Sequence, residues 1–174
     1  MISKLERTRR FNELAEAYST DLYRYAMWIS GNDALAKDLV QETFLRAWRA
    51  LDKLNDVAAA KSWLITILRR EYARTFERKV PLFTDLENVV IADDGLEPDD
   101  KTEHDLLRKG ILKLDPKYRD PLLLQVIFGH SCAEIAEQLD ITRSAVMTQL
   151  FRAREKLKEQ LQKDGVTGNV HELF

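Results

Sequence analysis

The fold of the C-terminal part of the chain is decided by residues 131–157, SCAEIAEQLDITRSAVMTQLFRAREKL. Ser131 and Glu134 have the spacing of a capping box, which opens a helix. After a short turn, Thr142 can cap a second helix. Its apolar residues recur at steps of three and four, at Val146, Leu150, Ala153, Leu157 and Leu161. Two helices joined by so short a turn predict a helix-turn-helix.

The apolar stripe leaves over an outer face on this second helix. Besides Glu155, it carries the six candidate DNA-reading residues Arg143, Ser144, Met147, Thr148, Phe151 and Arg152. In a DNA-binding helix-turn-helix, the second helix lies in the major groove and its first turns meet the base edges. Hydroxyl groups suit base edges or phosphates, and Phe151 can pack on a thymine methyl group. The pattern predicts a DNA-reading face, with an ordinary helical hairpin and a solvated outer face as the alternative.

Most of the remaining chain also has helical periodicity. Apolar residues at helical spacing predict helices within residues 11–29, 35–51, 61–76 and 106–114. Gly31 ends the first of these, and Asn32 or Asp33 can cap the second. A further helix runs to Phe128, and we expect Asp120 to cap it with Pro121 at its first position, because a proline inside a helix removes a hydrogen bond.

The charge pattern divides the chain into three segments. Residues 1–79 carry +4, residues 80–104 carry −7, and the remainder carries +1. The middle segment lacks periodicity and holds two of the four prolines, so we interpret it as an acidic flexible linker that self-repulsion keeps extended. We therefore expect an all-α protein of two small helical domains. The domains span residues 1–79 and 105–162, and the second is followed by a tail at 163–174.

Composition excludes several other classes. The chain has 174 residues, 45% of them apolar, and a net charge of −2. Its one cysteine, Cys132, excludes an intramolecular disulfide, and no segment has the apolar length of a signal peptide or a bilayer span. We expect a cytoplasmic protein without direct membrane insertion. The three histidines match no catalytic or metal-ligand pattern, so we expect neither enzymatic activity nor a cofactor.

Two further surfaces carry candidate binding residues. The helix within 61–79 combines cations that neutralise phosphate with aromatic rings on which unpaired bases stack. Its candidate residues are Lys61, Trp63, Arg69, Arg70, Arg74 and Arg78. The alternative is that the aromatic rings are core and the arginines are only solvated. On the preceding helix, Asp38, Gln41 and Glu42 form a patch that can receive arginines from a partner, or they are simply a polar helix face.

These motifs together resemble the extracytoplasmic-function sigma factors of bacterial RNA polymerase. The resemblance rests on DLVQETFLRAW at residues 38–48, on WLITILR at residues 63–69, and on residues 114–157. It covers about residues 8–79 and 105–162. Two unlike motifs stand in the family's order around an acidic linker, which makes the match specific.

The resemblance implies a role for each surface. Asp38, Gln41 and Glu42 would bind the clamp helices of the polymerase β′ subunit. The loop at 52–62 and the helix that follows would open the minus-10 promoter element and hold a flipped base. The C-terminal domain would read the minus-35 element with its last helix and bind the β flap. An anti-sigma factor is a further implied partner, and no metal or nucleotide is implied.

Two departures from the family pattern keep other functions open. Family members commonly carry Asn or Asp where Arg70 and Arg74 stand, and often a basic residue where Met147 and Gln149 stand. A promoter-directing sigma factor is the leading hypothesis. A sigma-like decoy that sequesters an anti-sigma factor without initiating transcription is the second. A conventional helix-turn-helix regulator, which would bind duplex DNA as a dimer without polymerase, is the third.

Overall fold

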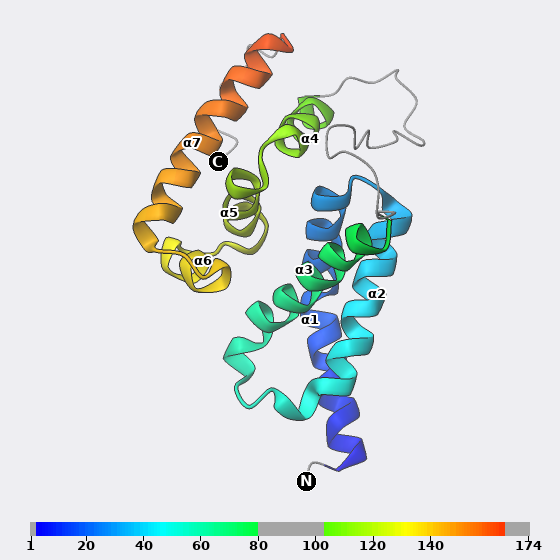
Figure 1. The fold of residues 1–174 in the computed structure, drawn as a ribbon. Helices are drawn as coiled ribbons and strands as arrows, with labels where there is room; N and C mark the ends of the chain where they lie inside the picture. The colour runs from blue at the N-terminus through cyan, green and yellow to red at the C-terminus, as the bar shows by residue number, and fades with distance from the viewer. Residues whose placement is uncertain (1–2, 80–102, 166–174) are drawn as a thin grey trace. The chain divides into compact units, whose positions relative to one another are not determined.

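The computed structural model describes residues 3–79 and 103–165 (Figure 1). Within these ranges the chain forms helices and no strand, which confirms the all-α prediction. None of the helices in the described ranges has both the length and the apolar character needed to cross a membrane. The predicted linker lies outside the described residues from 80 to 102, as does the predicted tail from 166 onward. The chain divides into two compact units, Met1–Leu96 and Glu97–Phe174.

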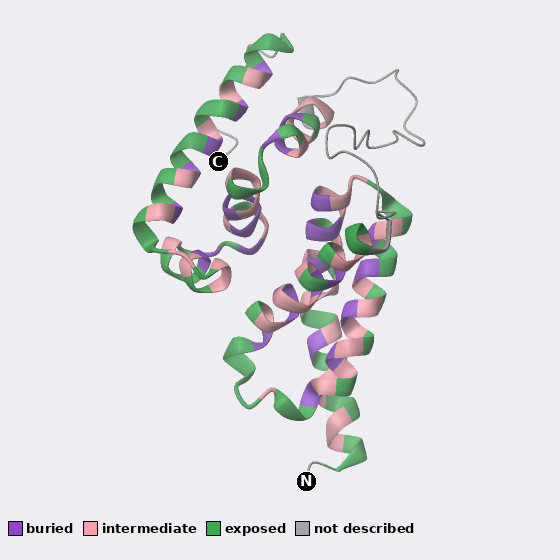
Figure 2. Cartoon of the chain, viewed as in Figure 1, coloured by how far each residue is buried: buried purple, intermediate pink, exposed green. Residues whose placement is uncertain are grey.

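Three helices pack side by side in the N-terminal unit (Figure 1). They are α1 (Lys4–Ser30), α2 (Asp33–Ala50) and α3 (Ala60–Lys79), and two single 3-10 turns, η1 (Leu51–Lys53) and η2 (Val57–Ala59), connect the last two. The buried side chains line the inner faces of the three helices (Figure 2). Ala26, Ala36 and Ala47 are fully buried, and their small side chains let the helix backbones approach closely.

The boundary between α1 and α2 follows the local sequence. Gly31 adopts a left-handed conformation with a φ of 65°, and its N–H donates to the Met27 carbonyl at 2.9 Å. Asn32, one of the two predicted caps, accepts from the Leu35 N–H at 2.9 Å. The Lys37 ammonium and the Tyr23 hydroxyl both hydrogen-bond Asp33, and they hold the pKa of that carboxyl below its usual range. Asp33 in turn raises the pKa of Lys37.

The C-terminal unit is organised around one helix. The helices α4 (Glu103–Lys113), α5 (Pro116–Phe128) and α6 (Cys132–Leu139) each pack against α7 (Arg143–Lys163). The predicted apolar stripe of α7 is buried along its full length, from Val146 to Leu161. Gly110 of α4 permits a close approach to this stripe, because a Cβ atom there would lie 2.8 Å from Cδ1 of Leu157.

The predicted start of α5 is wrong. Asp115, not Asp120, caps the helix by accepting from the Lys117 N–H at 3.1 Å, and Pro116 takes the first helical position. Pro121 therefore lies inside the helix, where it removes the hydrogen bond to the carbonyl four residues earlier. Only one such bond is lost near the helix start, and the Pro121 ring is buried in the core. Burial of this ring offsets the lost bond, and Asp115 and Pro116 supply the cap and the first-turn proline with which helices commonly begin.

The helix-turn-helix is confirmed in its details. Ser131 and Glu134 form the predicted capping box, with the Glu134 carboxylate 2.7 Å from the Ser131 N–H and the Ser131 hydroxyl 3.2 Å from the Glu134 N–H. Asp140 ends α6 in a left-handed conformation with a φ of 55°. The Thr142 hydroxyl then accepts from the Ala145 N–H at 3.1 Å and opens α7. These caps fix the point at which the predicted DNA-reading helix begins.

A first prediction concerns Gly129, which ends α5 with a φ of 65° and has open space where a Cβ atom would lie. Gly129→Ala should destabilise the C-terminal unit by about 1 kcal/mol, because only the left-handed backbone penalises the new methyl group. Gly129→Asn, which tolerates this conformation, is the matched control and should cost less. The measurement is urea unfolding followed by circular dichroism.

The three tryptophans, Trp28, Trp48 and Trp63, all lie in the N-terminal unit. Their fluorescence transition should therefore keep its midpoint in both variants. A shift of this transition equal to the shift in circular dichroism would contradict separate unfolding of the two units.

Candidate nucleic-acid interface

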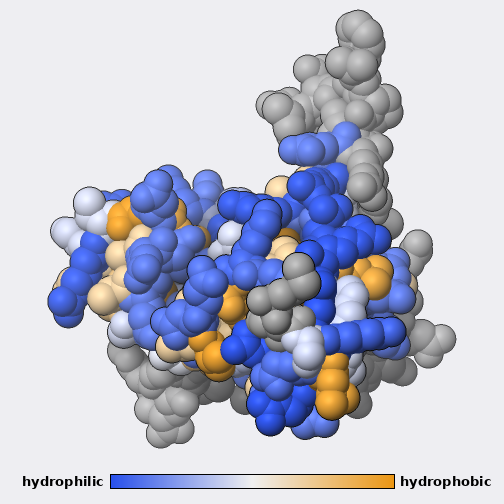
Figure 3. Space-filling model, turned by 90° about the horizontal axis from the view of Figure 1, so that it is seen from below, coloured by the Kyte–Doolittle hydropathy of each residue, from blue (hydrophilic) through white to orange (hydrophobic). Residues whose placement is uncertain are grey.

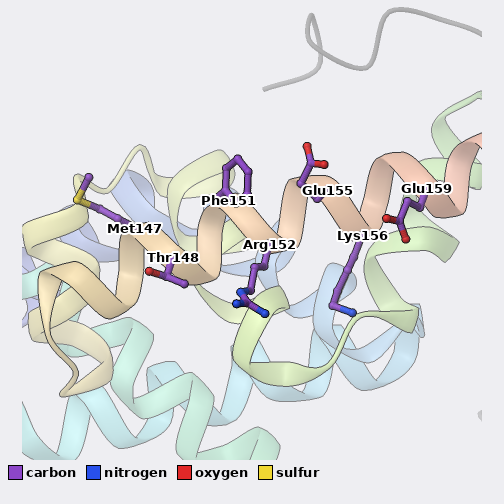
Figure 4. A pocket seen from close by; sticks show the side chains of 7 residues that line it. All are labelled: Met147, Thr148, Phe151, Arg152, Glu155, Lys156 and Glu159. Atoms are coloured by element: carbon purple, nitrogen blue, oxygen red, sulfur yellow. The ribbon is translucent and has the colours of Figure 1, made fainter.

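The six residues predicted to read DNA all lie exposed on α7. Met147 is 57% exposed and Phe151 is 65% exposed, high values for large apolar side chains. Figure 4 shows two rows along the helix, with Met147, Phe151 and Glu155 pointing to one side and a polar row to the other. The polar row consists of Thr148, Arg152 and Lys156. An open hollow along α7 is lined by both rows and by Glu159.

The cations of this unit differ in how firmly they are held. Arg154 donates to Oε1 of Gln125 on α5, so its guanidinium ties α7 to the core. Lys156 lies 5.6 Å from the ring centre of Tyr118, within cation–π range. Arg143 and Arg152 are exposed, and neither has an ion pair within the part of the chain that the structure describes. Arg143 and Arg152 are therefore the cations of the predicted DNA-reading face that are available to contact phosphates.

Only some of the candidate DNA-binding residues of α3 share one face of the helix. Arg70 is exposed and Arg74 follows one turn later. Arg69 turns toward α1, where its guanidinium donates to the Tyr25 hydroxyl at 3.0 Å. Lys61 is half-buried at the start of the helix. Arg78 lies in the last turn of α3, and its side chain is outside the described residues.

The aromatic residues of α3 divide between the core and the surface. Trp63 packs against a small buried cluster of Leu14, Leu51 and Ala60. The Tyr72 hydroxyl donates to the Ile29 carbonyl at 2.6 Å, which ties α3 to α1. Phe76 remains 43% exposed and meets the Tyr72 ring edge to face, with centroids 4.8 Å apart. Of these three rings, Phe76 is thus the most open to a stacking base.

The predicted patch on α2 is present as one helix face. Asp38 and Gln41 are exposed, whereas Glu42 is half-buried. The Glu42 carboxylate lies 3.0 Å from Nε of Arg46, one turn along the same helix. Asp38 and Gln41 therefore present open acceptors, and any cation of a partner that binds Glu42 competes with Arg46.

An ionic chain continues from Glu42 into the core, and sequence analysis missed its central members. Arg46 on α2 lies 2.6 Å from the carboxylate of Glu71 on α3, and Arg74 donates to the same carboxylate oxygen at 2.8 Å. Glu71 is only 6% exposed. One signal for it was available, because Glu71 lies three residues after Leu68 and thus within the apolar stripe of α3. A carboxylate at a core-facing position needs a cation from a neighbouring helix.

The face shown in Figure 3 is mostly hydrophilic, and its apolar side chains lie in small patches. The exposed large apolar residues of the described chain are Leu5, Leu45, Val57, Phe76, Val126, Met147 and Phe151. Met147 and Phe151 belong to the predicted DNA-reading face, so that face combines apolar and basic contacts.

Comparison with known proteins agrees with this arrangement. Two family models match the chain, sigma-70 region 2 over residues 14–80 and sigma-70 region 4 over residues 104–157. The ECF RNA polymerase sigma factor SigL of Mycobacterium tuberculosis is 31% identical over 163 residues, which are 88% of this chain and 90% of SigL. The ECF RNA polymerase sigma factor SigM of Bacillus subtilis is 28% identical over 151 residues, 84% of this chain and 92% of SigM.

Two solved structures share the fold. The sigma factor RpoE in complex with the anti-sigma factor NepR, from Bartonella quintana, matches with a TM-score of 0.70 and 23% identity over 88% of this chain and 98% of RpoE. CnrH in complex with the cytosolic domain of CnrY matches with a TM-score of 0.67 and 25% identity over 90% of each chain. The chain belongs to the sigma-70 family. Within that family it is an extracytoplasmic-function sigma factor, as the sequence resemblance implied.

A second prediction tests whether the exposed α7 residues serve binding and not folding. Met147→Gln and Phe151→Ala should each change the free energy of unfolding by less than about 0.5 kcal/mol, because both side chains are mainly in solvent. Leu150→Ala, in the buried stripe between them, is the matched control and should cost about 2–5 kcal/mol. Urea unfolding followed by circular dichroism measures all three. A loss near that of Leu150→Ala in either exposed variant would assign it a structural role.

Proposed function

We propose that this chain directs core RNA polymerase to specific promoters from within the cytoplasm, and that it acts by binding and not by catalysis. The observation that carries the proposal is the pair of sigma-70 regions, region 2 before region 4, with the polar outer face of α7 left exposed. In this proposal α3 and the loop before it contact and melt the minus-10 element. The outer face of α7 reads the minus-35 element.

The α2 patch is the proposed contact with polymerase. Asp38, Gln41 and Glu42 offer carboxylate and amide oxygens on one face, which suit arginines of the β′ clamp helices. The C-terminal unit is proposed to bind the β flap as well. Two attachments to polymerase fix the spacing of the DNA-reading surfaces, so the second DNA contact forms at a raised effective concentration.

The minus-10 surface proposed on α3 is small. Arg70 and Arg74 share one face of α3, and Phe76 leaves its ring exposed on another side of the helix, while Trp63 and Arg69 are held by contacts within the protein. Arg78 completes the proposed set. Melting a base pair and flipping one base cost a few kcal/mol, which stacking and phosphate contacts must offset.

An anti-sigma decoy is the second candidate function. The apolar row of Met147 and Phe151 continues into Glu155, a combination that suits a protein partner with basic and apolar groups. One structural relative, RpoE of Bartonella quintana, is described in complex with an anti-sigma factor, NepR. An anti-sigma partner is therefore proposed for this chain under both functions. The two functions differ in whether polymerase binding and initiation occur.

A third prediction tests promoter-directed initiation. The purified chain, mixed with core polymerase and a library of random promoter sequences, should yield transcripts that share two sequence elements upstream of their start points. The double variant Asp38→Arg and Glu42→Arg should lose most of this transcription, because like charges then face the polymerase arginines. Lys113→Glu, a charge reversal on α4, is the matched control. Absence of any chain-dependent transcript, with anti-sigma binding retained, would favour the decoy.

A fourth prediction concerns the phosphate contacts of α7. Arg152→Ala should weaken binding of holoenzyme to its selected promoter, and it should reduce the slope of log affinity against log salt concentration by about 1. Lys163→Ala, an exposed cation at the end of the same helix, is the control and should leave the slope unchanged. The measurement is a salt titration of promoter binding by fluorescence anisotropy. An unchanged slope in Arg152→Ala would remove this residue from the DNA interface.

A further inference from the structure

The ionic chain between α2 and α3 connects the two proposed binding surfaces of the N-terminal unit. It runs from Glu42 in the α2 patch through Arg46 and Glu71 to Arg74 on α3, with atom-to-atom distances of 3.0, 2.6 and 2.8 Å. Its two ends are half-exposed, with 39% of the Glu42 side chain and 43% of the Arg74 side chain accessible. Glu71, in the middle, is 6% exposed.

The chain is built from shared atoms. Nε of Arg46 approaches the carboxylates of both Glu42 and Glu71, and it makes no well-directed hydrogen bond to either within the described structure. One oxygen of Glu71 faces both Arg46 and Arg74. Each ion pair therefore competes with the next one for the shared atom. A change in one ion pair alters the strength of the adjacent ion pair.

Burial makes the central carboxylate sensitive to this competition. A buried charge is costly unless a cation and hydrogen bonds compensate it, and two arginines do so for Glu71. Loss of Arg74 to another anion would leave Glu71 dependent on Arg46 alone. Arg46 would then move from Glu42 toward Glu71. When Glu42 binds a different cation instead, Arg46 is free to pair with Glu71 alone, and Glu71 depends less on Arg74.

We infer that Glu71 is a positioning residue that couples the polymerase-facing patch to the DNA-facing helix; this rests on the proposed function of both surfaces. A cation of polymerase that binds Glu42 releases Arg46 to Glu71. Glu71 then holds Arg74 less tightly, and Arg74 becomes available to a DNA phosphate. Because binding free energies are reciprocal, DNA that takes Arg74 also makes Glu42 more available to polymerase.

The coupling can be tested in the free full-length chain by NMR of the arginine side chains. Glu42→Gln removes the first charge, and the Nε–H signals of both Arg46 and Arg74 should shift. Asp38→Asn, one turn away on the same face, is the matched control and should leave Arg74 unchanged. In a Glu71→Gln background, Glu42→Gln should no longer move the Arg74 signal. If Glu42→Gln leaves the Arg74 signal unshifted in the otherwise unchanged chain, the inference is overturned. This outcome does not depend on whether the Glu71 variant folds.

A binding measurement separates this inference from the proposed function. Single-stranded DNA carrying the selected minus-10 sequence should raise the affinity of the chain for core polymerase, by about 5-fold at the lower end of allosteric coupling. Glu71→Gln should reduce this factor toward one. If Arg74→Gln leaves DNA binding intact while the NMR coupling persists, the DNA role of α3 fails and the positioning role of Glu71 stands. If Arg74→Gln weakens DNA binding but NMR coupling is absent, only the inference fails.

Discussion

The inner stripe of α7 is the contact on which the C-terminal unit depends. Residues spaced by three and four along this helix are buried by α4, α5 and α6 together, and burial of apolar area is the main favourable term in folding. The stripe also fixes the rotation of the helix about its own axis. The opposite side, with Ser144, Thr148 and Arg152, is therefore exposed by the same packing that stabilises the unit. A change in the core would move the proposed DNA-reading face.

The core of the N-terminal unit differs from that of the C-terminal unit, because one of its buried positions holds a charged residue. Glu71 lies inside the α2–α3 contact and is compensated by an arginine from each helix. Replacing such a buried pair by apolar side chains is often neutral or stabilising, so stability alone is a weak explanation for its presence. The position of the pair, between the α2 patch and Arg74, gives it a functional explanation that stability does not.

Sequence reasoning predicted the elements that depend on local chemistry. The capping box at Ser131, the cap at Thr142 and the glycine that ends α1 at Gly31 are all as expected, because each depends on atoms within a few residues. It failed at the start of α5, where burial of Pro121 in the core outweighs a lost hydrogen bond. Asp115 and Pro116 supply a local cap and a first-turn proline that favour the earlier start, and burial of the Pro121 ring, a tertiary contact, compensates for the proline inside the helix.

In the candidate site, too, some features follow from local spacing and others depend on tertiary packing. The exposed face of α7 followed from periodicity, because residues outside a buried stripe face solvent. The role of Arg69 did not, since its hydroxyl partner Tyr25 lies 44 residues earlier on another helix. The ionic partners of Arg46 and Arg74 were hidden for the same reason. Spacing along one helix identifies which side chains share a face, but only packing shows which of them bind inward.

The internal contacts of several arginines limit how many cations of this chain are open to a binding partner. Arg46 and Arg69 are held by the protein itself, and Arg154 ties α7 to α5, so a count of basic residues overstates what is available to DNA. Arg74 is intermediate, because its guanidinium is partly exposed but already donates to Glu71. A sigma factor whose DNA-facing cations are few and partly occupied gains little from non-specific phosphate contacts. On the proposed function, its affinity for promoters depends on attachment to polymerase, which would supply the fixed spacing that two weak surfaces need in order to act together.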